Sequence, residues 1–239
     1  SAEVPGLATA VFQAGVSDER ISLTQGTREI VFGLKLANGM QVEKVYRFSA
    51  DSYVMGFDVR VFNGSDQPVT DSLSIAMREA YPGKKNSNVF EGPSALVGKS
   101  LETIEVDDIA KKNTLTGKII WVALQSRYFA TSLIPLKEEE ASLRLTVLPG
   151  HVVEAQYDSP EQVIDPNSRQ SFEYQLFFGP KDINAVRPAG HQLEQIVDFG
   201  MFDILAKPCL WLLNFIYGVI PNYGVAIIIL TILTKILLW

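Results

Sequence analysis

Apolar and polar residues alternate along residues 21–79 of this 239-residue chain. Ile30, Phe32 and Leu34 occupy every second position, so their side chains lie on one face of an extended strand. Asn38-Gly39 follows, and both residue types tolerate the positive φ angles that a tight hairpin turn requires. The pattern predicts antiparallel β-structure with one face in contact with water.

The alternation recurs at regular intervals up to about residue 180. Pro, Gly and Asn residues separate the runs, and residues 81–117 form a looser stretch that contains short strands such as 94–97. Evenly spaced short strands favour a β-sandwich over a βαβ fold. The predicted strands are 40–48, 53–62, 69–80, 117–135, 143–148, 152–157 and 170–178.

The pattern changes at Gly179-Pro180. Residues 181–200 are polar with spaced apolar positions, which predicts one or two short helices. Residues 201–217 are rich in aromatics, and Asp203, Lys207 and Asn214 fall on one narrow stripe at about 100° per residue.

A thin polar stripe on an aromatic helix is typical of the membrane–water interface. We expect the stripe to face water and the apolar side chains to face lipid. The alternative is an amphipathic helix buried in a soluble domain. The side chains expected in the interface are Phe202, Trp211, Leu212 and Phe215.

The last fifteen residues, Val225 to Trp239, are almost entirely apolar. A membrane span needs about 20 such residues, so we expect the truncated start of a transmembrane helix, and a chain that is a fragment of a larger membrane protein. Lys235 is the one charge in this segment, and Thr231 precedes it by one helical turn. This pair indicates a wet groove within a helix bundle, and the alternative is a lysine that reaches out to the headgroups.

Composition excludes several function classes. The net charge is −6 without a basic stripe, which argues against nucleic-acid binding. Cys209 is the single cysteine, so the chain forms no internal disulfide and has no cysteine-based zinc site. Ser1 to Gly15 does not have the pattern of a signal peptide, so an exported domain would depend on a signal upstream of Ser1. We expect neither a metal nor a cofactor.

Catalytic motifs are absent from the sequence. His151 and His191 are the only histidines, and both follow a Gly in turn-like segments. No GxSxG, HExxH, Walker or GxGxxG motif occurs. The sequence therefore predicts no catalytic residues, and a protein that is not an enzyme.

Several motifs carry a resemblance to a known family. The chain resembles the YidC membrane insertases of bacteria over nearly its whole length, with the most specific matches in residues 117–135 and 178–235. The matching motifs are Tyr53 through Val69, Trp121-Val122-Ala123, Tyr128-Phe129-Ala130-Thr131, Gly179-Pro180, Asp198-Phe199-Gly200 and Asn222-Tyr223-Gly224.

The resemblance implies a fold and a location. The chain would be the large periplasmic domain of an inner-membrane insertase, with residues 1–200 in the periplasm. It would be mainly β, an antiparallel β-supersandwich of the galactose-mutarotase-like type, followed by short C-terminal helices. The implied divisions are a sandwich over 1–180, linking helices over 181–200, an interfacial amphipathic helix over 201–220, and a transmembrane helix that starts at 222 and is cut off at 239.

The resemblance also implies a function. An insertase and chaperone would assist insertion and folding of nascent membrane proteins, alone or with the Sec translocon, in contact with the lipid bilayer. The domain would be monomeric. The family usually has Arg where this chain has Lys235, and Lys keeps the charge but lacks the bidentate fork.

Two other functions stay open at this point. The implied sandwich is shared with sugar epimerases, so a membrane-anchored carbohydrate-binding or epimerase-like domain is one alternative. Such an enzyme needs a placed acid and base, and the two turn histidines weaken that reading. A structural docking domain for the Sec machinery is the other alternative.

Overall fold

A computed structural model describes residues 7–17, 20–81, 89–197 and 203–238. The chain divides into two compact units. The sandwich unit comprises Ser1–Asn86 with Phe90–Val197, and the helical unit comprises Asp198–Trp239 with Ser87–Val89. Each unit is described by itself below.

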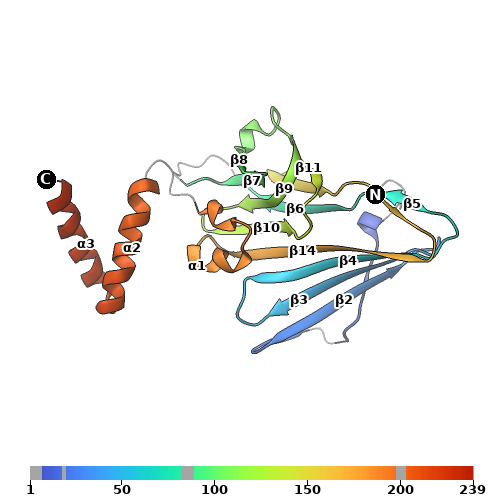
Figure 1. Cartoon of the computed structure of the whole chain (residues 1–239), viewed down its shortest axis with the longest axis horizontal. Coiled ribbons are helices and arrows are strands. Elements are labelled where there is room, and N and C mark those ends of the chain that lie inside the picture. Colours follow the sequence, from blue (N-terminus) through green and yellow to red (C-terminus); the bar gives the residue numbers. More distant parts are fainter. Residues whose placement is uncertain (1–6, 18–19, 82–88, 198–202, 239) are drawn as a thin grey trace. The chain divides into compact units, whose positions relative to one another are not determined.

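The sandwich unit consists of β-strands with four short 3₁₀ turns and one short helix (Figure 1). Its strands are β1 (Gln13–Ala14), β2 (Thr27–Lys35), β3 (Gln41–Ser49), β4 (Val54–Asn63), β5 (Val69–Asp71), β6 (Ser74–Ala80), β7 (Gly92–Val97), β8 (Ser100–Thr103), β9 (Thr114–Gln125), β10 (Phe129–Pro135), β11 (Glu140–Leu148), β12 (Val152–Asp158), β13 (Gln162–Ile164) and β14 (Ser168–Pro180). Its helical elements are η1 (Leu7–Thr9), η2 (Val106–Asp108), α1 (Ile183–Val186), η3 (Arg187–Ala189) and η4 (Leu193–Ile196). The helical unit contains α2 (Asp203–Val219) and α3 (Tyr223–Leu238).

Strand β9 belongs to both layers of the sandwich. Its second half, Val122–Gln125, pairs with β10, and its first half, Thr114–Lys118, pairs with β11. The first layer runs in the order β8-β7-β9-β10-β14-β4-β3-β2-β1, and the second runs β9-β11-β12-β6. All of these pairs are antiparallel, so the predicted mainly antiparallel β-sandwich is confirmed.

The strand bends between its two halves. Gly117 has φ 135°, a conformation that favours glycine, and an added Cβ would lie 3.0 Å from Val97 Cγ1. The neighbouring ladder shifts register between Leu96 and Val97, as a β-bulge does. The Gly117 conformation and the neighbouring bulge together bend β9, so that its two halves lie in different layers.

The core lies between the two layers. Alternate residues of β11 and β12, among them Leu143 and Val153, are buried and belong to one hydrophobic cluster with Val59 and Leu133 of the first layer. Full burial of such a side chain contributes about 1.5–3 kcal/mol. Aromatic rings cross the core in a chain of contacts, with centroid distances of 4.8 to 6.1 Å; the members are Phe32, Tyr46, Phe57, Tyr174 and Tyr157.

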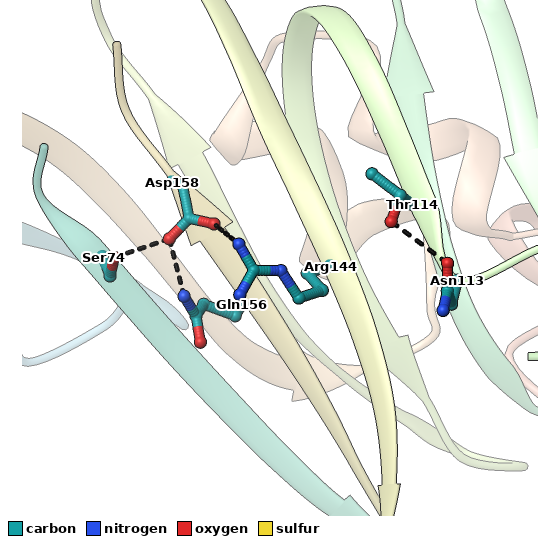
Figure 2. A network of polar contacts seen from close by, with 6 residues as sticks. All are labelled: Ser74, Asn113, Thr114, Arg144, Gln156 and Asp158. Carbon is teal, nitrogen blue, oxygen red and sulfur yellow. Dashed lines mark hydrogen bonds and ion pairs between the residues drawn. The ribbon is translucent and has the colours of Figure 1, made fainter. Parts of the chain in front are cut away.

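The outer face of the second layer is polar. Ser74 of β6 and Gln156 both donate hydrogen bonds to Asp158 Oδ1, at 2.5 and 2.7 Å (Figure 2). Arg144 of the adjacent β11 lies 3.3 Å from Asp158 Oδ2. This face therefore suits contact with water.

The outer face of the first layer is covered in part by the segment 183–197. The helix α1 contacts β14, and η4 contacts β9. Trp121 of β9 and Phe177 of β14 are fully buried although they point away from the core, and Leu193 and Ile196 are buried on the covering segment. Asp182 caps α1 by accepting hydrogen bonds from two backbone N–H groups.

A buried carboxylate lies on the same outer face, in β4. Asp58 is only 4% exposed and accepts two hydrogen bonds from the Arg47 guanidinium, at 2.6 and 2.7 Å. The Arg47 side chain passes over Gly56, where an added Cβ would lie 2.9 Å from Arg47 Nε. Hydrogen bonding to Asp58 raises the pKa of Arg47, and the carboxylates of Glu29 on β2 and Glu173 on β14 add to this effect.

We expect Arg47→Met to destabilise the domain by about 2–3 kcal/mol, because it leaves a buried carboxylate without its two charged hydrogen bonds. Arg78→Met is the matched control. Arg78 also lies 2.6 Å from a carboxylate, that of Glu154, but its side chain is 64% exposed. An exposed pair contributes less than about 1 kcal/mol. Denaturant unfolding measures the stability of both variants. Equal unfolding midpoints of the two variants would contradict the larger stabilising role given to Arg47.

The unit boundary generates a second prediction. A chain that ends after Val197 retains every strand and the covering segment 183–197, so it should be soluble, folded and monomeric. Circular dichroism and sedimentation test this outcome. If the shortened chain aggregates while the longer chain does not, α2 belongs to the core of the sandwich.

Candidate functional site

The helices α2 and α3 form a hairpin. The two helices contact each other, and the Tyr217 and Tyr223 rings stack at 4.0 Å across the connection. Among the described side chains of this unit, only Ile216 and Ala226 are buried. The remaining apolar side chains of the hairpin are therefore partly or largely exposed.

Asn222 starts α3. Its side-chain oxygen accepts hydrogen bonds from Gly224 N at 2.9 Å and Val225 N at 3.3 Å. These bonds satisfy two of the backbone donors that the first turn of a helix leaves unpaired. The Asn222-Tyr223-Gly224 motif thus contains the cap of the second helix.

One face of α2 is aromatic and exposed. Trp211 and Phe215 stack at 5.7 Å and are 68% and 58% exposed. Asn214 is exposed beside them, whereas Leu212 is half-buried. Phe202 lies outside the described residues. Asp203 and Lys207 lie in α2, but their side chains are outside the described part.

Lys235 and Thr231 lie one turn apart on α3, and both are exposed. The Thr231 hydroxyl donates a hydrogen bond to the Ile227 carbonyl at 2.7 Å, within its own helix. Thr234 does the same toward Leu230 at 3.0 Å. Lys235 makes no ion pair with any described residue, so its ammonium is a charge on an apolar helix that a partner or water must satisfy.

The described helices are short for a membrane. Across residues 7–17, 20–81, 89–197 and 203–238, no helix combines the length and the hydropathy required to cross a bilayer. The helix α3 has 16 described residues.

The sandwich unit has a pocket of about 370 Å³ where β10 leaves β14. Glu139 lies 2.9 Å from Lys137 and has a side chain only 16% exposed, although nothing in the run Glu138 to Glu140 sets it apart in the sequence. The pocket is lined by Pro135, Leu136, Lys137, Glu139, Gln162, Gln170, Ser171, Phe172, Glu173 and Tyr174.

Two buried tyrosines close to this pocket have raised pKa values. Burial raises the pKa of Tyr157 to about 12, with a further contribution from Glu139. Burial also raises the pKa of Tyr174. Both phenol side chains therefore stay protonated at neutral pH and do not act as general bases.

The two histidines lie away from the pocket. His151 and His191 are exposed and occupy turns with φ of 58° and 50°. Their placement in surface turns agrees with the sequence-based interpretation. Among the described residues, no group of three or more His, Cys, Asp or Glu side chains could hold a metal ion.

Comparison with known proteins identifies the family. The family model described as the YidC periplasmic domain matches residues 2–212 of the chain. The chain belongs to this family. The resemblance seen in the sequence is thereby confirmed.

Curated YidC relatives extend the match. The chain is 32% identical to the membrane protein insertase YidC of Syntrophus aciditrophicus over 231 residues, which are 95% of this chain and 42% of that protein. It is 34% identical to the protein of the same name from Pelobacter propionicus over 213 residues, 87% of this chain and 39% of that one. The chain thus spans about two fifths of the length of the YidC proteins that it matches.

Solved structures with a similar fold include an enzyme. The α-galactosidase AgaA from Geobacillus stearothermophilus, in complex with raffinose, is 10% identical with a TM-score of 0.53, over 81% of this chain and 31% of that one. A galactose mutarotase related enzyme from Lactobacillus acidophilus has a TM-score of 0.49 at 12% identity, over 71% of each chain. At such identities the likeness to the α-galactosidase concerns the fold alone.

The Asn222 cap predicts a local effect in the YidC hairpin. Asn222→Ala should destabilise the first turn of α3 by about 1 kcal/mol, which raises amide exchange there about fivefold. Asn222→Asp keeps the oxygen acceptor and serves as the control. Hydrogen–deuterium exchange of the micelle-bound chain measures both. Unchanged exchange of the Gly224 and Val225 amides in Asn222→Ala would contradict the capping role.

Proposed function

We propose that this chain is the periplasmic module, with the first core helix, of an insertase that assists the insertion and folding of inner-membrane proteins. The insertase acts alone or with the Sec translocon, in the inner membrane, with residues 1–200 on the periplasmic side and the sandwich monomeric. The main support is the match to the YidC periplasmic domain together with relatives that are named membrane protein insertases.

The exposed aromatics support an interfacial position for α2. Water solvates stacked rings such as Trp211 and Phe215 poorly, and indole and phenyl side chains are enriched where hydrocarbon meets headgroups. In this arrangement the aromatic face contacts lipid, and Asn214 lies at the edge that meets water. The helix lies along the membrane surface and leads directly into α3.

The composition of α3 supports its role as the start of a transmembrane helix. Its exposed side chains include Ile228, Ile232 and Ile236, each more than half exposed. These side chains would contact lipid or other helices. Lys235 lies about 20 Å along the helix from Asn222 at 1.5 Å per residue, which is past the middle of a hydrocarbon core about 30 Å thick.

The charge of Lys235 is the chemically active feature of this arrangement. The Thr231 hydroxyl is already bonded to a backbone carbonyl, so Lys235 remains available to a substrate. In a hydrated groove, its ammonium attracts acidic segments of nascent proteins and lowers the cost of moving them toward the bilayer. At an effective dielectric of about 20, a charge pair at 4 Å contributes about 4 kcal/mol before desolvation costs.

Substitution of Lys235 in the full-length insertase tests this proposal. Lys235→Arg should preserve insertion, because the charge is kept. Lys235→Ala and Lys235→Glu should impair insertion of substrates that carry acidic residues, because nothing then offsets desolvation of the carboxylates. An insertion assay in cells depleted of the native insertase measures the effect.

Substrates without acidic residues provide the control, since their insertion should change little in any variant. Thr231→Ala should have a smaller effect than Lys235→Ala, because the Thr231 hydroxyl is bonded within the helix. Equal insertion of acidic substrates by all variants would assign Lys235 to headgroup anchoring instead.

A further inference from the structure

The exposed aromatic side chains of the sandwich unit lie at one end of it. Among the described residues 7–17, 20–81 and 89–197, four aromatics are exposed over more than a third of their surface: Tyr53, Tyr128, Phe129 and Phe178, at 53%, 66%, 60% and 46%. All other described aromatics of this unit are buried or half-buried. These four residues are named the aromatic rim below.

Backbone pairing places the members of the rim at one end of the sheet, where the Tyr53 ring packs against Phe177, at 6.4 Å, on the face of β14 opposite Phe178. Phe178 N donates a hydrogen bond to Tyr53 O at 3.0 Å, and Lys181 N donates one to Tyr128 O at 2.8 Å. Phe129 is paired with Pro180, which makes Phe178 its diagonal neighbour on the same face of the sheet. The rim therefore lies where β4 and β10 begin and β14 ends (Figure 1).

The charged residues that flank the rim in sequence already have partners. Arg127 lies over the Tyr128 ring at 5.4 Å, and Lys181 Nζ donates to Phe90 O at 3.1 Å. Asp182 caps α1, and Asp51 accepts a hydrogen bond from Ser49. The positive charges of Arg127 and Lys181 equal in number the negative charges of Asp51 and Asp182. This end of the sandwich therefore does not favour a strongly charged partner.

A neutral surface of tyrosine and phenylalanine rings suits the boundary between headgroups and acyl chains. Such rings have an apolar body, and tyrosine adds a polar tip that stays hydrated. The same chemistry appears on α2 as Trp211 and Phe215. In the sequence, the segment 183–197 follows β14 and precedes α2.

We infer that the aromatic rim is a second membrane-contacting surface, which inserts its rings into the periplasmic headgroup layer of the bilayer. The inference rests on the proposed function in one respect, the membrane position of the chain. It adds that the sandwich is held against the bilayer at a defined end, so that its polar β6-β12-β11 face stays in water.

Depth-dependent fluorescence quenching tests the inference. Cys209→Ser removes the only native thiol. A single cysteine is then introduced as Phe129→Cys in the rim or as Trp211→Cys on α2, and is labelled with an environment-sensitive fluorophore. Val163→Cys is the matched control, because Val163 is 59% exposed, like Phe129 at 60%, but lies in β13 at the other end of β14. Each labelled 239-residue chain is reconstituted into phosphatidylcholine–phosphatidylglycerol vesicles that contain a lipid with a nitroxide near the headgroup.

The nitroxide should quench the label at position 129 several-fold more than the label at position 163. Phe178→Ser should reduce quenching at 129 and leave quenching at 211 unchanged, because it removes the neighbouring ring from the rim only. Added salt should not change quenching at 129.

The labels also separate the inference from the proposed function. Quenching at 211 with none at 129 beyond the control overturns the inference and leaves the interfacial helix in place. Quenching at 129 without quenching at 211 supports the inference and contradicts the position proposed for α2. Absence of quenching at positions 129 and 211 overturns the inference and the proposed position of α2. Equal quenching at positions 129 and 163 contradicts the claim that one defined end of the sandwich contacts the bilayer.

Discussion

The sandwich depends on one strand that pairs in both of its layers. Because β9 contributes its first half to one layer and its second half to the other, this strand joins the two layers covalently. The bend at Gly117 requires a backbone conformation that other residues rarely adopt. With the layers joined there, the buried sides of β11 and β12 face those of β4, β10 and β14, and one core forms between them.

The same layering separates three environments on a small domain. The inside is apolar and aromatic, and the outer face of β6-β12-β11 is polar. The outer face of the first layer carries both the buried Asp58 carboxylate, paired with the partly exposed Arg47, and an apolar area that the segment 183–197 covers. A fold of this type also occurs in an α-galactosidase, and at 10% identity that likeness concerns the fold alone. The features described above for this chain lie on its surfaces and in its helical unit.

Much of the architecture could be predicted from local patterns. Alternation at period two is a property of each strand alone, so the β-class and most strands followed from it, and Asn38-Gly39 correctly marked the β2–β3 hairpin. The helix expected over 201–217 is observed as Asp203–Val219. The insertion of β14 between β4 and β10 could not be predicted, because β14 pairs with β4 residues more than a hundred positions away, and such pairing leaves no local signal.

The surfaces were harder to predict than the strands. Tyr128 and Phe129 read as part of an apolar strand, and only the folded sheet shows that this strand end is uncovered. Helical spacing placed Lys235 and Thr231 on one face, but no local pattern specifies what packs around them. Glu139 is sheltered because β10 leaves β14 beside it, which the run of three glutamates does not reveal.

The covering segment 183–197 has a mechanical consequence. The chain leaves β14 at Pro180, packs Leu193 and Ile196 into a buried position, and only then continues toward the helical unit. A pull on the helical unit must therefore first extract these apolar side chains before it reaches the sheet. Behind them, β14 is flanked by β4 and β10, so force along its axis would shear two ladders of hydrogen bonds at once instead of opening them one by one. The domain is thus built to keep its shape while one of its ends is under tension.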